Sequence, residues 1–160
     1  MGNANGTITL YEFSDYNCGY CKRIFKDLQA VLAEQPDVRL VVKEFPILAE
    51  TSVLAAKAAI AAHRQGKFRQ FHISMMTWRG KIDGDAIDAA VQKAGLDKNR
   101  LRKDMEDELT AAILSKTRAA AAALEVRGTP ALIIGENIIP GAISKNEILD
   151  LINQTRAAKN

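Results

Sequence analysis

The pattern of apolar and polar residues predicts a strand followed directly by a helix near the start of the chain. Residues 7–13 alternate between the two kinds and are rich in β-branched and aromatic side chains, which is typical of a strand. A second strand is predicted over residues 38–45 and ends at Pro46. Between them, apolar residues recur at helical spacing until Pro36, and they are Ile24, Phe25, Leu28, Val31 and Leu32. This part is therefore a β-α-β unit with a parallel pair of strands.

From residue 52 to about residue 123 the pattern becomes helical and the chain is rich in Ala, Lys, Arg and Glu. Residues 52–64 form one predicted helix, closed by Gly66, and a second carries an apolar stripe from Phe68 to Met76. Asp83 or Asp85 is expected to cap a third helix. A fourth helix, the longest, is predicted as one continuous element from about residue 98 to residue 124.

Strands return after this helical block. Residues 131–134 and 138–139 are separated by a short turn that contains Gly135, so they are predicted to form a hairpin. Ser144 and Glu147 make the capping box of a closing helix. The order predicts an α/β protein in which residues 1–49 and 125–160 form one domain and residues 50–124 an inserted helical domain.

Composition narrows the function classes. The chain has 160 residues, 48% hydrophobic and 26% charged, as in soluble globular proteins. Its 22 Lys and Arg against 19 Asp and Glu are scattered, which argues against a nucleic-acid partner. No apolar run approaches the ~18 residues of a membrane span. Residues 1–6 lack the apolar stretch of a signal peptide, and we interpret this start, so close to the first strand, as a trimmed one.

The only two cysteines, Cys18 and Cys21, stand where the first strand passes into the helix. Free N–H groups and the positive end of the helix dipole favour a thiolate at this place. Cys18, nearer the helix end, is expected to have the lower pKa. A CxxC pair in this context predicts thiol–disulfide redox chemistry.

Three other interpretations of the pair remain open. A structural disulfide across so short a loop constrains the unfolded chain little. A zinc site needs further ligands, and His63 and His72 lie nine residues apart, which does not match a zinc finger. The third is a Cu(I)-binding or metal-resistance protein that uses the two soft thiolates as ligands.

Glu12 shares a face of the first strand with Ile8 and Leu10, so its carboxyl group is expected to point toward the core. Burial raises the pKa of a carboxyl group, and Glu12 is then able to accept the proton that Cys21 must lose. The alternative is an acid near the strand end that reaches solvent. His72 and Trp78 are interpreted as packing residues.

Three segments resemble the DsbA-like branch of the thioredoxin superfamily: EFSDYNCGYC at residues 12–21, KEFPIL at residues 43–48 and GTPA at residues 128–131. Within that branch the chain is most similar to CGYC-bearing proteins, including the suppressor for copper sensitivity C group. The resemblance implies a thioredoxin fold with an inserted all-helical domain. It also implies a protein disulfide oxidoreductase that needs no cofactor or metal.

The resemblance assigns roles to individual residues. It makes Cys18 the nucleophile, Cys21 the resolving thiol and Glu12 the buried acid. Pro130 matches the family's cis-proline, with Thr129 before it. These two residues, with Gly19 and Tyr20, are expected to bind substrate.

The resemblance also implies partners and a compartment. Proteins with thiols or disulfides are the expected substrates, a redox protein is the expected partner, and the expected location is the periplasm. DsbA itself has Pro-His between its cysteines, whereas this chain has Gly19-Tyr20. A neutral Tyr20 supplies no positive charge, so Cys18 is expected to be less acidic than the DsbA cysteine, whose pKa is about 3.5. The disulfide is expected to be correspondingly less oxidising.

Overall fold

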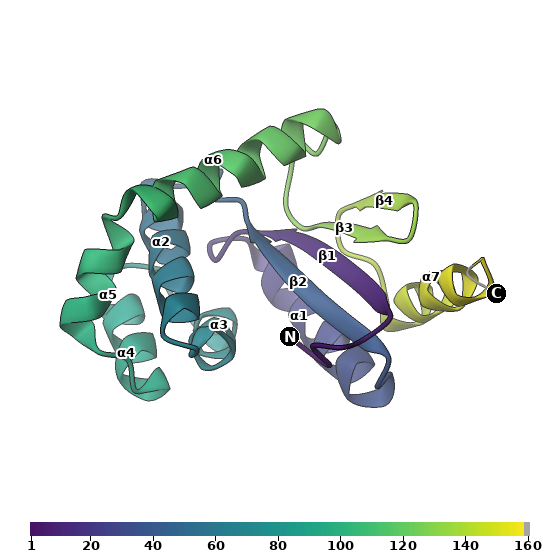
Figure 1. The fold of residues 1–160 in the computed structure, drawn as a ribbon, viewed down its shortest axis with the longest axis horizontal. Coiled ribbons are helices and arrows are strands. Elements are labelled where there is room, and N and C mark those ends of the chain that lie inside the picture. Colours follow the sequence, from purple (N-terminus) through teal and green to yellow (C-terminus); the bar gives the residue numbers. More distant parts are fainter. Residues whose placement is uncertain (159–160) are drawn as a thin grey trace.

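The computed structural model describes residues 1–158. Its centre is a four-stranded sheet in the order β2-β1-β3-β4 (Figure 1). Strand β1 (Ile8–Ser14) pairs in parallel with β2 (Val38–Glu44) and antiparallel with β3 (Ala131–Ile134). The edge strand β4 (Asn137–Pro140) pairs antiparallel with β3. The predicted α/β fold, with its parallel pair and C-terminal hairpin, is confirmed.

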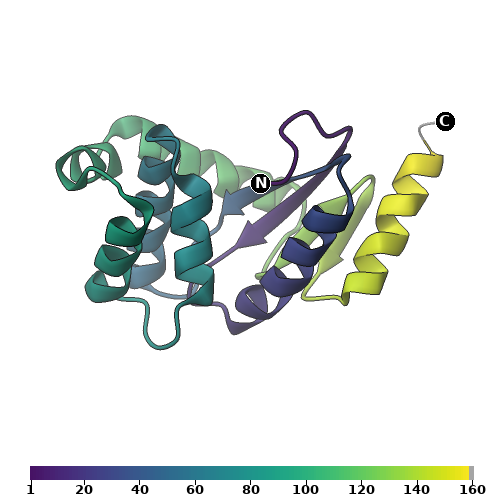
Figure 2. The ribbon, with the colours of Figure 1, turned by 90° about the horizontal axis from the view of Figure 1, so that it is seen from below.

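Helices cover both faces of this sheet. Helices α1 (Gly19–Glu34) and α7 (Lys145–Ala157) lie side by side on one face, and α6 (Glu108–Ala123) lies on the other (Figure 2). The predicted capping box of Ser144 and Glu147 begins α7. Every second residue of β1 packs under α1 and α7, in a core of fully buried side chains that includes Ile8, Leu10, Ile24, Leu28, Leu132, Ile148 and Ile152.

The remaining helices gather beside the sheet, at the left of Figure 1. They are α2 (Glu50–Arg64), α3 (Phe68–Thr77), α4 (Gly84–Ala94) and α5 (Lys98–Met105). Helix α2 buries a run of alanines, whose small side chains let its neighbours approach closely. These helices share one hydrophobic core with the start of α1, a core that includes Cys18, Cys21, Phe25, Phe71 and Met75. The division into two domains at residues 49 and 124 therefore stays a prediction.

The prediction of one continuous helix from residue 98 to residue 124 is wrong, because the chain turns between α5 and α6. Asp107 ends the helical pattern: its carboxylate accepts a hydrogen bond from the backbone N–H of Leu109 (2.8 Å) and caps α6. The Thr110 hydroxyl donates to the carbonyl of Asp104 (2.6 Å). Local side-chain bonds thus compete with the helical ladder at this point. Of the two predicted caps of α4, the structure uses Asp83.

None of the helices in the described part of the chain combines the length and the apolar character that crossing a bilayer requires.

Candidate active site

Cys18 is the N-cap residue of α1, directly after the loop that follows β1. Its sulfur accepts a hydrogen bond from the backbone N–H of Cys21 (3.3 Å), and its own N–H donates to the carbonyl of Asp15 (3.0 Å). Only 5% of Cys18 is exposed, and Cys21, one turn into the helix, is fully buried. Both cysteines are free thiols in this structure.

The two sulfurs differ in acidity. Hydrogen bonding from the Cys21 thiol lowers the pKa of Cys18 to about 6, with help from the side chain of Thr129 and from the N–H groups of Cys21 and Tyr20. Donation to Cys18, followed by burial, raises the pKa of Cys21 far above its usual range. At neutral pH the pair therefore consists of a Cys18 thiolate and a Cys21 thiol, which is the state needed for nucleophilic attack.

The loop before β3 brings Thr129 and Pro130 to Cys18. The Cys18 sulfur lies 3.2 Å from the Thr129 carbonyl oxygen, to which the thiol form donates a hydrogen bond. The peptide bond between Thr129 and Pro130 is cis. Pro130 and Tyr20 line a groove of about 940 Å³ beside the dithiol. Tyr20 is 60% exposed, and Gly19 is exposed as well, so both stand at the surface around Cys18.

Glu12 lies beneath the dithiol and is fully buried on β1. No hydrogen-bond partner reaches either carboxyl oxygen from the described residues. Burial raises the pKa of Glu12 to about 7; the Ser14 hydroxyl, which faces it, opposes the rise, and the Cys18 charge adds to it. Glu12 in turn raises the pKa of Cys21, so the two groups interact. The carboxyl group of Glu12 is able to hold or release a proton near neutral pH.

Asp15 organises the loops around the cysteines, and the sequence analysis assigned it no role. Its carboxylate accepts hydrogen bonds from three backbone N–H groups: Asn17 (2.8 Å), Ile47 (2.9 Å) and Leu48 (3.1 Å). The first of these bonds spans two residues, the spacing of an Asx turn, and this was a signal in the sequence. The bonds to residues 47 and 48 come from a distant loop, for which the sequence holds no local signal.

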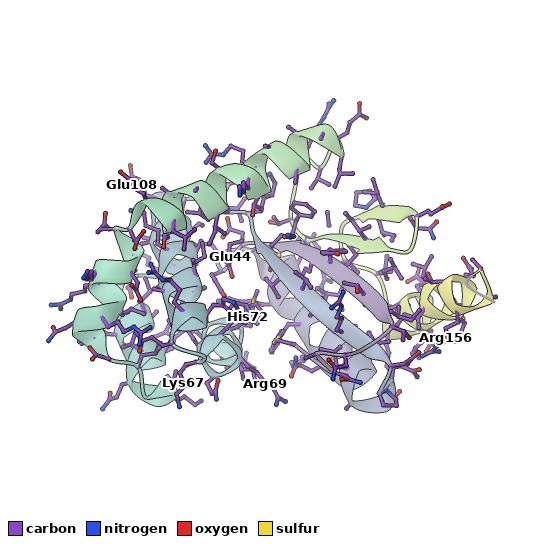
Figure 3. The ribbon with its side chains drawn as sticks, viewed as in Figure 1. Glu44, Lys67, Arg69, His72, Glu108 and Arg156 are labelled. Atoms are coloured by element: carbon purple, nitrogen blue, oxygen red, sulfur yellow. The ribbon has the colours of Figure 1, made fainter. Side chains whose placement is uncertain are left out.

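A second buried group escaped the sequence analysis. The Tyr16 hydroxyl donates to the Glu44 carboxyl group (3.0 Å) and lies 2.9 Å from His72 Nδ1. Figure 3 shows Glu44 and His72 in the interior between the sheet and α3. The alternation that identified Glu12 applies equally to Glu44, which follows Val38 and Leu40 on one face of β2, and this was the available signal.

The other candidate residues lie outside the site. His72 is fully buried, as predicted, although its polar contact was not foreseen. His63 is exposed in the last turn of α2. Trp78 packs against the core of the helical part, and its indole N–H donates to the Lys81 carbonyl (3.0 Å). Within residues 1–158, no group of three or more His, Cys, Asp or Glu side chains is placed to hold a metal ion.

A sheet with a CxxC pair at the start of a covering helix, and with a helical insertion, defines a thioredoxin-like protein. A family model described as the DSBA-like thioredoxin domain matches residues 9–153. The chain therefore belongs to the family of DSBA-like thioredoxin domains, which confirms the resemblance seen in its motifs.

Several solved structures are similar over nearly the whole chain. A thioredoxin-like oxidoreductase from Silicibacter pomeroyi is 36% identical, with a TM-score of 0.95 and coverage of 98% of this chain and 91% of that one. A periplasmic thioredoxin-like protein from Salmonella enterica is 33% identical (TM-score 0.90; 98% and 88% covered). The thiol-disulfide exchange protein alpha-DsbA2 from Wolbachia pipientis is 27% identical (TM-score 0.88; 96% and 84% covered).

Curated relatives are much longer than this chain. The Na⁺/H⁺ antiporter NhaA 3 of Salinispora tropica is 25% identical over 135 residues, which are 83% of this chain and 21% of the antiporter. The chain thus spans about a fifth of the length of this relative.

Proposed function

We propose that this chain exchanges disulfides with protein substrates through Cys18 and Cys21. The observation that carries the proposal is the opposite shift of two neighbouring pKa values, which gives a thiolate at the helix start with slight exposure and a fully buried thiol one turn behind it. Similar proteins are named as an oxidoreductase and a thiol-disulfide exchange protein, and this supports the proposal over copper binding by the same two thiols.

The reaction begins when the Cys18 thiolate attacks one sulfur of a substrate disulfide. That bond breaks, a mixed disulfide forms, and the second substrate sulfur leaves as a thiolate. Cys21 then gives its proton to Glu12 and attacks the Cys18 sulfur. The first substrate sulfur leaves as a second thiolate, and water protonates both substrate thiolates. Two electrons pass from the cysteine pair to the substrate, and the reverse sequence oxidises a substrate dithiol.

The substrate-binding roles of Thr129, Pro130, Gly19 and Tyr20 are part of this proposal. Tyr20, Thr129 and Pro130 line the groove beside the dithiol, Gly19 is exposed next to Cys18, and the groove has room for an extended peptide. We propose that the backbone of Thr129 pairs with such a peptide near the sulfur under attack.

The finer assignments rest on comparison. Because one similar protein is described as periplasmic, we propose an exported location and a separate redox protein as the partner that resets the dithiol. Tyr20 carries no charge near the thiolate, so we propose a potential less oxidising than the roughly −120 mV of DsbA.

Cysteine variants test the function. Cys18→Ala should abolish reduction of insulin disulfides, because no nucleophile remains at the surface. Cys21→Ala should retain the first attack and accumulate mixed disulfides with substrate, which non-reducing electrophoresis and mass spectrometry detect. Equal activity of Cys18→Ala and the unmodified protein would refute the proposal. Competition with a Cu(I) chelator, run in parallel, checks the copper alternative, and tight Cu(I) binding by an exchange-inactive protein would favour it.

A further inference from the structure

Buried polar side chains continue from Glu12 away from the dithiol. Glu12 and Ser14 lie two residues apart on β1 and therefore share the face that α1 covers. In the parallel ladder Ser14 is the register partner of Glu44 on β2. Neighbouring strands lie about 4.8 Å apart, so Ser14 is one strand spacing from Glu44 and two residues from Glu12 on the same face of the sheet. It is 1% exposed, and no described residue provides it with a geometrically sound hydrogen bond.

Glu44 is the last of the three buried residues Glu12, Ser14 and Glu44, and Tyr16 and His72 fix its position. Tyr16 donates to its Oε1 atom (3.0 Å), and His72 Nδ1 lies 2.9 Å from the same hydroxyl oxygen. A tyrosine hydroxyl has one proton. It points to Glu44 when that carboxyl group is charged, and it is free to turn to neutral His72 when Glu44 is protonated. The Tyr16–His72 pair therefore accommodates both protonation states of Glu44.

Glu44 also borders a cavity of about 350 Å³ that opens at the surface between β2, α2, α3 and α6. Glu12 lines neither this cavity nor the groove beside the dithiol. Glu12 is fully buried, whereas Glu44 connects the interior with a place that water can occupy.

We propose that Ser14 and Glu44 carry to water in this cavity the proton that Glu12 receives from Cys21, while Tyr16 and His72 hold Glu44 in position. The inference rests on the proposed disulfide exchange. Protonated Glu12 gives its proton to the Ser14 oxygen, and the Ser14 proton passes to Glu44. Glu44 then releases a proton to water, so that Ser14 is unchanged and Glu12 is again a carboxylate. Glu44 never touches the reacting sulfurs and acts only through Glu12.

The electrostatics agree with this route. Burial raises the pKa of Glu44, the Tyr16 hydroxyl opposes the rise, and the charge of Glu12 adds to it. A charge on Glu12 therefore disfavours a charge on Glu44, and a proton on Glu44 is favoured while Glu12 is a carboxylate. The titratable groups around Glu44 and its cavity come from the N-terminus, from β1 and its following turn, from β2, from α2 and from α3: the amino group of Met1, Glu12, Asp15, Tyr16, Lys43, His63 and His72.

The test measures release of the mixed disulfide from variants of this 160-residue chain between about pH 6 and about pH 8. Each of two substitutions interrupts the proposed path from Glu12 through Ser14 to Glu44. Glu44→Gln keeps the shape of the side chain but removes its acid, and Ser14→Ala removes the hydroxyl group. Each should leave the first attack by Cys18 unchanged and slow the release step about tenfold near the acid limit. The defect should shrink toward the alkaline limit, where hydroxide removes protons faster. In a Glu12→Gln background the same changes should have no further effect, because the proton no longer enters this path.

Infrared spectroscopy gives a signature that a purely structural role would not produce. The oxidised-minus-reduced difference spectrum should contain carboxyl signals of both Glu12 and Glu44, and Glu44→Gln should remove one of them. Asp104→Asn is the matched control, because Asp104 is also a buried acid but pairs with Arg64 (3.2 Å) in the helical part. It should change neither the spectrum nor the pH profile.

Wild-type exchange is measured first, so that failure of the proposed function is recognised separately. If the wild type exchanges disulfides, a Glu44→Gln profile equal to that of the wild type overturns the relay. The relay is also overturned if Glu44→Gln slows release of the mixed disulfide in the Glu12→Gln background by as much as it does in the wild type. If Glu44→Gln does not fold, the same criteria apply to Ser14→Ala.

Discussion

Among single residues, Cys18 and Cys21 show most directly how position determines chemistry. Cys18 is the N-cap residue of α1, and its sulfur accepts hydrogen bonds, whereas Cys21 lies one turn into the helix and its thiol donates to Cys18. The CxxC spacing and the strand-to-helix junction predicted this difference. The raised pKa of Glu12 was likewise predictable from alternation along its strand.

The acidity of Cys18 predicts that the stability of the reduced protein depends on pH. Its pKa is about 6 in the folded protein and near 9 when unfolded, so between these values the unfolded chain binds more protons. The free energy of unfolding of the reduced form should therefore rise with pH in this window, by up to about 1.4 kcal/mol per pH unit, and this gain should be lost as pH falls through 6.

Urea denaturation of the reduced and oxidised proteins measures the effect. Their difference removes the groups that titrate alike in both forms and leaves the thiols, together with the part of the Glu12 titration that depends on the Cys18 charge. Cys18→Ser has no thiolate at this position and forms no disulfide, so its free energy of unfolding should lack the rise with pH that the reduced wild type shows. A difference that is flat with pH in the wild type contradicts the assignment of the thiolate.

Among elements, the start of α1 depends on a loop that comes from elsewhere in the chain. Asp15 joins the turn after β1 to residues 47 and 48, and Asn17 donates to the hydroxyl groups of Thr51 (3.1 Å) and Ser52 (2.9 Å). The position of Cys18 is thus fixed by contacts to the segment between β2 and α2 and to the first turn of α2, in addition to its own helix.

Asp15→Asn should lower the free energy of unfolding by about 1–3 kcal/mol, since an amide satisfies the three N–H groups less well than a carboxylate. It should also raise the pKa of Cys18, because the N-cap geometry loosens; absorbance of the thiolate against pH measures this. Asp83→Asn is the matched control, since Asn caps a helix as well as Asp does, and it should change neither quantity. An unperturbed Cys18 in Asp15→Asn would show that α1 positions its own cap.

Helices and strands were predictable from the sequence where local interactions determine them. Periodicity and capping residues identified the sheet strands, α1 to α4 and α7. They failed at residues 105–108, where helix-forming composition conceals a cap made by Asp107. The contact between Tyr16 and His72 had no local signal, because the two residues lie 56 positions apart and only the folded chain brings them together.

At the scale of the whole molecule, the helical insertion and the dithiol share a core. Phe71 of α3 packs edge-on against Tyr16, with ring centroids 6.3 Å apart. The Lys22 ammonium group of α1 donates to the Trp78 carbonyl (3.0 Å) at the end of α3. These contacts cross the domain boundary predicted at residue 49, so the insertion forms part of the environment of the cysteines.

This sharing predicts a single cooperative unfolding transition. Trp78 fluorescence reports on the helical part and alkylation of buried Cys21 reports on the start of α1, and their urea midpoints should coincide. Phe71→Ala should lower both midpoints together, at a cost of about 3–5 kcal/mol. Ile148→Ala, in the other core, should also move both. Separate transitions for the two probes would indicate independent domains.

Gly19 and Tyr20 lie next to Cys18 but outside the hydrophobic core. A Cβ atom added at Gly19 would meet no atom within 4 Å, and Tyr20 is largely in solvent. Mutations here are therefore nearly neutral for folding, yet they act next to the sulfur, where one pKa unit corresponds to about 30 mV of potential. Natural selection or a small combinatorial library is consequently able to retune this dipeptide without compensating changes elsewhere, so one scaffold gives access to a graded series of oxidants and reductants.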